Sequence, residues 1–150
     1  MLFRSWGVQD VMGVKLVRQN SKKPGCGPAC VAMLAGLSKP ANHHFASGDS
    51  QRTFWPDIII ALLAEKLIPS KPRWGGLLSA KHLPKENLER ELKNRSVGSA
   101  ILKVNKNNQN KWHWIVWDAE CSKILDPLDG SVKRERRRYK ITAFMEVQKK

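Results

Sequence analysis

The residue pattern changes at Gly98, and this change constrains the fold more than any other feature of the sequence. Ahead of it, apolar residues at helical spacing predict helices at 28–36, 57–67 and 84–93. Behind it, β-branched and aromatic residues between turn-forming stretches predict strands at 99–104, 111–118, 123–126 and 139–147. Helices followed by strands, rather than alternating with them, are typical of an α+β fold, in which N-terminal helices pack on a C-terminal antiparallel sheet. A short alternating stretch at 14–18 predicts one further strand ahead of the first helix.

Length and composition indicate a globular chain. The 150 residues suit one domain, so we expect a single domain over residues 1–150. The longest apolar run, residues 58–64, is too short to cross a bilayer, and the N-terminus lacks the apolar region of a signal peptide. Three cysteines are an odd number and form no disulfide framework, which favours a reducing, cytoplasmic location.

The strong positive charge is the unusual bulk property of this chain. Lysine and arginine number 27 against 13 aspartates and glutamates, which gives a net charge of +14. Such a charge favours acidic partners, namely nucleic acid, anionic lipid or an acidic protein. The basic residues are spread along the chain with one dense run at 133–140, and a solvated strand edge has the same appearance. Binding of nucleic acid or of an acidic partner therefore stays open, while no membrane span is expected.

Cys26 stands between two glycines, immediately before the first expected helix, in the stretch "RQNSKKPGCGPACVAMLAG". The partial positive charge at a helix N-terminus stabilises a thiolate, which is the nucleophilic form of cysteine. The small neighbours leave room for a substrate, so this setting favours a nucleophile over a packed cysteine. Cys30, one helical turn further on, is expected in the core. No second pair of metal-binding residues matches these two cysteines, so neither a zinc site nor a cofactor is predicted.

His113 is the best of the four histidines for the base that a thiol nucleophile requires. It lies in an aromatic strand, "KWHWIVWD", where a polar side chain is unexpected and therefore suggests a specific role. His43 and His44 lie in a polar loop and are expected to be exposed. His82, just ahead of a helix, has no evident partner.

Asp126 is the candidate that orients His113. If a four-residue turn, 119–122, joins the strand of His113 to the next strand, position 113 faces position 128. Asp126 then lies on the same face, diagonal to His113 at about 7–8 Å, within reach of an imidazole. A shift of one residue in the register would put the two side chains on opposite faces. The competing interpretation is that Asp126 is only a turn residue before Pro127.

Gln19 completes the expected site. Acyl transfer through a thioester passes through an oxyanion, which needs hydrogen-bond donors. The sequence offers two of them, the side-chain amide of Gln19 upstream of the nucleophile and the backbone N–H of Cys26.

The stretches "CGPACVAMLAG", "SAILKV", "HWIVWD" and "ILDPLDG" together resemble the papain-like cysteine peptidases of the bacteriocin-processing type, over residues 14 to about 132. Those peptidases cut double-glycine leader peptides and are often fused to ABC transporters. The resemblance implies a papain-like fold, with Cys26 as nucleophile, His113 as general base and acid, and Asp126 as the orienting carboxylate. It also implies a peptide or protein substrate, with Gln19 as oxyanion donor. No GxxxxGK[ST] sequence occurs, so it implies a free-standing relative.

The leading expectation is a thiol hydrolase that cleaves a peptide or amide bond through an acyl-enzyme, and two alternatives stay open. The same residues suit an amidase, deamidase or transferase, as in a toxin or effector that acts on a host protein. The other alternative is a basic module that binds nucleic acid or an acidic protein. Trp112, Trp114 and Trp117 lie in an apolar strand, however, and are expected to pack rather than to stack on bases.

Overall fold

A computed structural model describes residues 14–18, 26–41, 44–45, 54–74, 76, 81–106, 108, 111–128 and 138–149. The helices among these residues are α1 (Cys26–Ala35), α2 (Trp55–Ala64) and α3 (Lys85–Asn94). The strands are β2 (Leu67–Pro69), β3 (Arg73–Trp74), β4 (Leu83–Pro84), β5 (Ala100–Val104), β6 (His113–Asp118), β7 (Lys123–Leu125), β8 (Arg138–Tyr139) and β9 (Ile141–Lys149). None of these helices is long and apolar enough to cross a membrane.

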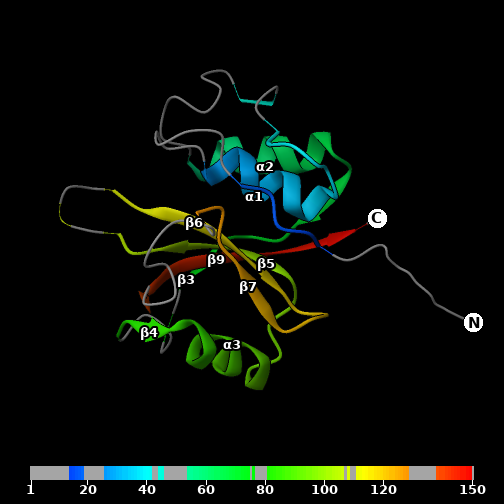
Figure 1. Cartoon of the computed structure of the whole chain (residues 1–150). Coiled ribbons are helices and arrows are strands. Elements are labelled where there is room, and N and C mark those ends of the chain that lie inside the picture. The colour runs from blue at the N-terminus through cyan, green and yellow to red at the C-terminus, as the bar shows by residue number, and fades with distance from the viewer. Residues whose placement is uncertain are drawn as a thin grey trace, which may run out of the picture.

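An antiparallel sheet forms the centre of the fold. Its strand order is β2-β9-β5-β6-β7, and β3 pairs with β9 beside this path. The strands β4 and β8 form a separate two-stranded ladder. Figure 1 shows α1 and α2 on one side of the sheet and α3 on the other. The mixed helix and antiparallel sheet architecture agrees with the α+β class expected from the sequence.

Each face of the sheet has its own apolar cluster, and β6 contributes to both. Trp114 and Val116 belong to the cluster under α1 and α2, whereas Ile115 and Trp117 belong to the cluster that includes α3. Successive side chains of a strand point to opposite faces. A strand that is covered on both sides therefore has a continuous run of apolar residues in its sequence. The expectation that Trp114 and Trp117 pack in the interior is confirmed, because each is 1% exposed.

The helix α1 is buried along almost its whole length. Every side chain from Cys26 to Leu34 is buried, and Pro28 occupies the first turn, where its missing N–H leaves no hydrogen bond unmade. Gly36 ends the helix with a φ of 76°, a conformation that glycine adopts without strain. The N–H of Leu37 then donates to the carbonyl of Ala32 at 2.9 Å, as at many helix ends. The first turn of α1 is therefore fixed inside the protein.

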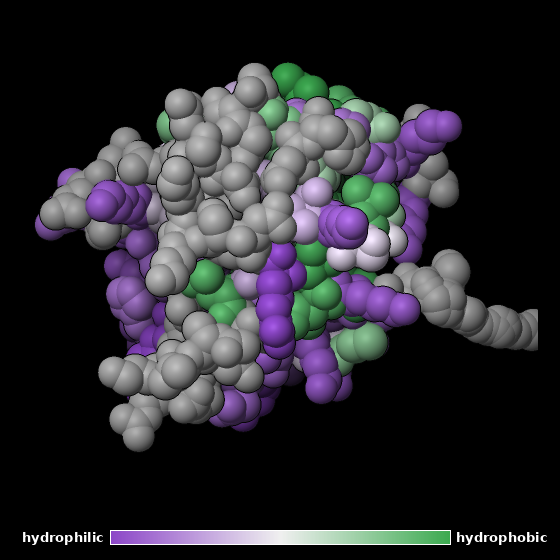
Figure 2. All heavy atoms as spheres, turned by 45° about the horizontal axis from the view of Figure 1, so that its top comes forward, coloured by the Kyte–Doolittle hydropathy of each residue, from purple (hydrophilic) through white to green (hydrophobic). Residues whose placement is uncertain are grey.

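The outer face of α2 keeps apolar side chains in solvent. Ile60 and Leu63 are 62% and 56% exposed, whereas Ile58 and Leu62 on the inner face are fully buried. Figure 2 looks onto the side of the molecule where α1 and α2 lie, and it shows apolar areas between hydrophilic side chains.

Several elements differ from the sequence prediction. The segment 14–18 buries Val17 but has no strand assignment, since no described residue pairs with its backbone. Three short strands are not predicted from the sequence: β2 begins at the end of the helix expected at 57–67, β3 lies in the Pro/Gly-rich stretch 69–82, and β4 adjoins the start of the helix expected at 84–93. Two of them, β2 and β3, exist because β9 supplies a hydrogen-bonding partner that is distant in the sequence. The sequence also does not indicate that α3 covers the face opposite to α1.

Candidate active site

The hairpin of β6 and β7 brings His113 and Asp126 together. Asp118 pairs with Lys123 across the turn 119–122, which is the register that the sequence predicts. His113 is the first residue of β6, and Asp126 directly follows β7. Nε2 of His113 lies 2.7 Å from Oδ1 of Asp126. The predicted hairpin register is therefore confirmed, and it places the imidazole and the carboxylate in contact.

The Asp126 carboxylate is almost fully enclosed and accepts hydrogen bonds on both oxygens. It is 1% exposed. Its Oδ1 also accepts the N–H of Leu128 at 2.9 Å, and its Oδ2 accepts the hydroxyl of Tyr139 at 2.8 Å. Burial alone would raise the pKa of Asp126, but the hydrogen bond and charge of His113, together with the other two donors, outweigh burial and lower that pKa. The residue thus forms a local turn and also holds the histidine, so the two interpretations of Asp126 are compatible.

Cys26 completes a continuous series of polar contacts. It is the first residue of α1 and is 6% exposed. Its thiol lies close enough to the imidazole for hydrogen bonding and charge to raise the pKa of His113. Because Asp126 occupies Nε2 of the imidazole, Nδ1 is the ring nitrogen left for the sulfur. The imidazole therefore lies between a thiol and a carboxylate.

The position of His113 between two acidic groups changes its proton affinity. Burial alone would lower the pKa of His113, because the charged imidazolium is poorly solvated. Hydrogen bonds to Asp126 and Cys26, together with the negative charge of each partner, reverse this effect and raise the pKa of His113 to about 9. The imidazole is therefore protonated at neutral pH, and it can donate a proton to a leaving group.

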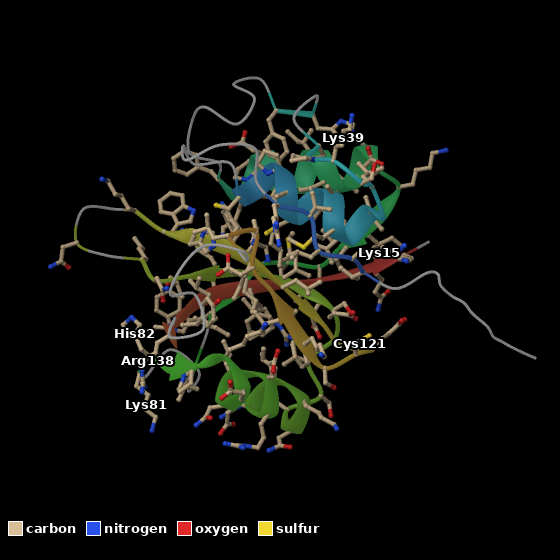
Figure 3. All side chains as sticks on the ribbon, in the orientation of Figure 1. Lys15, Lys39, Lys81, His82, Cys121 and Arg138 are labelled. Carbon is tan, nitrogen blue, oxygen red and sulfur yellow. The ribbon has the colours of Figure 1, made fainter. Side chains whose placement is uncertain are left out.

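The other two thiols differ from Cys26 in their surroundings. Cys30 is fully buried in the cluster under α1, as the sequence predicts, and burial raises its pKa well above the ordinary value. Cys121 is exposed at the turn between β6 and β7, as Figure 3 shows. The neighbouring charge of Asp118 raises the pKa of the Cys121 thiol. Both thiols therefore favour their unreactive protonated form.

The two tryptophans that flank His113 in the sequence, Trp112 and Trp114, make aromatic contacts. Trp114 packs edge-on against Trp55, with the ring centroids 4.7 Å apart. Trp112 contacts the ring of Phe54 at 5.2 Å, and the Lys103 ammonium lies 4.1 Å from the centre of the Trp112 ring. Phe54 is 49% exposed, so the aromatic surface that it forms with Trp112 is partly open to solvent. The tryptophans of β6 make intramolecular contacts, which weakens the argument for base stacking.

Of the other residues named from the sequence, those that the structure describes do not join this site. Gln19 and His43 lie outside the described residues, so the role of Gln19 stays a prediction. The expectation that His44 is exposed is wrong, because its side chain is half-buried and hydrogen-bonds Glu65 at the end of α2. His82 is exposed just ahead of β4. Within the described ranges, no three histidine, cysteine, aspartate or glutamate side chains are grouped so that they could hold a metal ion.

Tyr139 is the residue of this site that sequence reasoning does not single out. It is the only tyrosine of the chain, and it reaches the carboxylate from β8. No spacing rule connects it to Asp126, because the ladder that holds β8 pairs it with β4, distant in the sequence. A signal for this contact is therefore absent from the local sequence.

Comparison with known proteins gives one informative result. No protein-family model matches the chain, and no curated protein matches it. The chain is similar to a solved structure described as the crystal structure of a double glycine motif protease from an AMS/PCAT transporter in complex with the leader peptide. The two chains share 16% sequence identity with a TM-score of 0.51, and the match covers 92% of this chain and 94% of that one. At this identity the likeness shows the fold alone, a mixed helical and antiparallel sheet fold that this chain shares with a papain-like cysteine peptidase.

Proposed function

We propose that this chain is a cysteine peptidase-like thiol hydrolase, formed by one papain-like domain over residues 1–150. Cys26 is the nucleophile, His113 the general acid and base, and Asp126 the orienting carboxylate. The observation that carries this proposal is the 2.7 Å contact of the His113 imidazole with a buried carboxylate, together with a thiol near enough to raise the pKa of that imidazole. The likeness in fold to a protease supports it.

The first chemical step is acylation of Cys26. Its sulfur attacks the carbonyl carbon of the substrate as the thiolate, paired with protonated His113, and a C–S bond forms as the C–N bond breaks. The protonated His113 gives its proton to the departing amine, so the amine leaves as a neutral product. The carboxylate of Asp126 keeps the imidazole in place during this transfer.

The second step is hydrolysis of the thioester. His113, now neutral, takes a proton from a water molecule as that water attacks the acyl carbon. The new C–O bond replaces the C–S bond, which releases the acid product and returns Cys26 and His113 to their starting state. The backbone N–H of Cys26, in the first turn of α1 where N–H groups have no partner within the helix, and the amide of Gln19 are the donors proposed for the oxyanion.

The proposed substrate is a peptide or protein. The structural neighbour holds a leader peptide, which is itself a polypeptide. Phe54 and Trp112, the residue that precedes His113 in the sequence, form a partly exposed aromatic surface that offers apolar contact to a bound chain.

Product analysis tests this function and separates it from its closest alternatives. The wild-type chain and Cys26→Ser are incubated with a peptide mixture, and the products are identified by mass spectrometry. A hydrolase is expected to give cleaved peptides with new carboxyl ends, and these should be missing with Cys26→Ser. Conversion of a side-chain amide to an acid, or transfer of an acyl group to an added amine, would instead identify a deamidase or a transferase. If wild type gives no Cys26-dependent product of any kind, the proposed function is wrong.

A second candidate function, binding of an acidic protein, rests on one surface feature. Figure 3 shows Lys81, His82 and Arg138 together at one corner of the molecule. The pairing of β4 with β8 brings them close, because Arg138 faces Pro84 across that ladder. All three are exposed. Salt-sensitive capture of an acidic polypeptide by wild type and Cys26→Ala alike would favour this function.

A further inference from the structure

The Tyr139 hydroxyl makes a contact that is well suited to hold a carboxylate. It donates to Oδ2 of Asp126 at 2.8 Å, while Oδ1 faces His113 at 2.7 Å. Tyr139 is 2% exposed and packs in the cluster that includes α3. A carboxylate can rotate about its Cβ–Cγ bond, and a donor on the second oxygen opposes that rotation. The phenol therefore restrains the oxygen that binds the imidazole.

The backbone around Tyr139 is fixed by Asn105. The Asn105 side chain donates to the carbonyl of Arg138 at 3.2 Å and accepts the N–H of Lys140 at 2.9 Å. The backbone N–H of Asn105 donates to the Lys140 carbonyl at 2.9 Å. These bonds engage the residues on both sides of Tyr139. Asn105 has a φ of 59°, and asparagine tolerates this left-handed conformation better than most residues.

An irregularity of the sheet lies at the same place. Lys103 of β5 pairs with Ala143 of β9, but the next residue, Val104, pairs with Ile141. Thr142 is therefore an extra residue on β9, which is a β-bulge. Bulges bend a strand and redirect the side chains near them. This one lies opposite the last two residues of β5 and close after β8.

We propose that Tyr139 is a positioning residue for the Cys26–His113–Asp126 site and that Asn105 fixes the backbone from which it acts. This inference rests on the proposed function. Tyr139 touches no reacting atom in that function and acts through Asp126 alone. Without its hydroxyl, the carboxylate keeps its charge but loses the restraint on its orientation.

Tyr139→Phe is the sharpest test, because it removes one oxygen atom and keeps the aromatic ring in the core. We expect kcat to fall roughly 10-fold, with KM changed by less than about 2-fold, since the lost bond orients the acid and does not bind substrate. NMR titration of the Asp126 carboxyl should show a raised pKa, because the hydroxyl is one of the donors that lower it. Asn105→Gly, which keeps the backbone conformation accessible but removes the side-chain bonds, should give the same changes in smaller measure.

Ile141→Val is the matched control. Ile141 is fully buried in the same cluster and lies on β9 close to Tyr139, so this variant loosens the packing without removing a donor from Asp126. It should leave kcat and the pKa of Asp126 as in wild type. The inference is overturned if Tyr139→Phe matches wild type in both quantities, or if Ile141→Val produces the same changes.

Alkylation of Cys26 by iodoacetamide separates this inference from the proposed function, because it requires no substrate. If wild type cleaves no peptide, the hydrolase function fails, and the alkylation rate with the Asp126 titration still decides the role of Tyr139. Slower alkylation and a raised Asp126 pKa in Tyr139→Phe support positioning. Equal alkylation rates and equal pKa values contradict it.

Discussion

Replacing Cys26 with alanine is expected to abolish turnover while leaving the fold intact. The change removes the atom that we propose forms the covalent bond to the substrate, so kcat should fall by a factor on the order of 10⁴ to 10⁶. The lost volume is one sulfur atom at the start of α1, and the helix keeps its apolar packing along Val31, Met33 and Leu34. The free energy of unfolding should therefore change by no more than about 1 kcal/mol. Steady-state kinetics and thermal unfolding check the two parts of this prediction.

Cys121→Ser is the control for Cys26→Ala. Cys121 is an exposed cysteine in the turn after β6, at the opposite end of that strand from His113, so its replacement should leave kcat unchanged. Activity that survives in Cys26→Ala would show that another group performs the chemistry. Equal losses in both variants would point to a general effect of thiol removal.

Replacing Asp126 with alanine is the second change with a large expected effect. It leaves the buried Nε2–H of His113 and the hydroxyl of Tyr139 without their acceptor. The imidazole then loses its fixed orientation and the charge that stabilises its protonated form, so kcat/KM should fall by a factor on the order of 10² to 10⁴. The pKa of His113, about 9 in wild type, should fall because burial remains while the carboxylate is gone. NMR titration of the imidazole gives this value directly.

Asp126→Asn separates orientation from charge. Asparagine keeps an oxygen that accepts the Nε2–H of His113, so the loss of activity should be smaller than with alanine. It removes the negative charge, so the pKa of His113 should still fall. If the pKa of His113 stayed near 9 in both variants, the carboxylate would not be what holds the proton on the imidazole.

The same pKa gives a dependence of stability on pH. The pKa of His113 is raised in the folded state, from an ordinary value of 6.5 to about 9. Its contribution to stability is therefore fully present below pH 6.5 and is lost as the pH rises through about 9. The Tm of wild type should fall as the pH rises over this range. The Tm of Asp126→Asn should fall much less.

The sequence predicts the hairpin at the site because local geometry determines it. A four-residue turn between two strands leaves little freedom in register, and the register decides which side chains share a face. The sequence alone is therefore enough to pair His113 with Asp126. Cys26 can be placed at a helix start in the same way, because Gly25, Gly27 and Pro28 mark that start. The helices and the long strands follow from their apolar periodicity.

The remaining features depend on contacts between segments that are distant in the sequence. Tyr139 contacts Asp126 because β4 and Asn105 hold β8 in place. No periodic pattern in the sequence indicates the pairing of β4 with β8. His44 is half-buried because it lies at the end of α2, where Glu65 accepts its hydrogen bond. The strands β2 and β3 are too short to have a pattern of their own and depend on β9. Such contacts are decided by packing, which local propensity does not describe.

Selective alkylation of the three cysteines, mapped by mass spectrometry at neutral pH, tests the central claim most directly. The account predicts that Cys26 reacts at least about 10-fold faster than exposed Cys121, and that His113→Ala removes this difference. Cys30 should stay unmodified in the folded protein. Faster labelling of Cys121 than of Cys26, or a Cys26 rate that is unaffected by His113→Ala, would contradict the account.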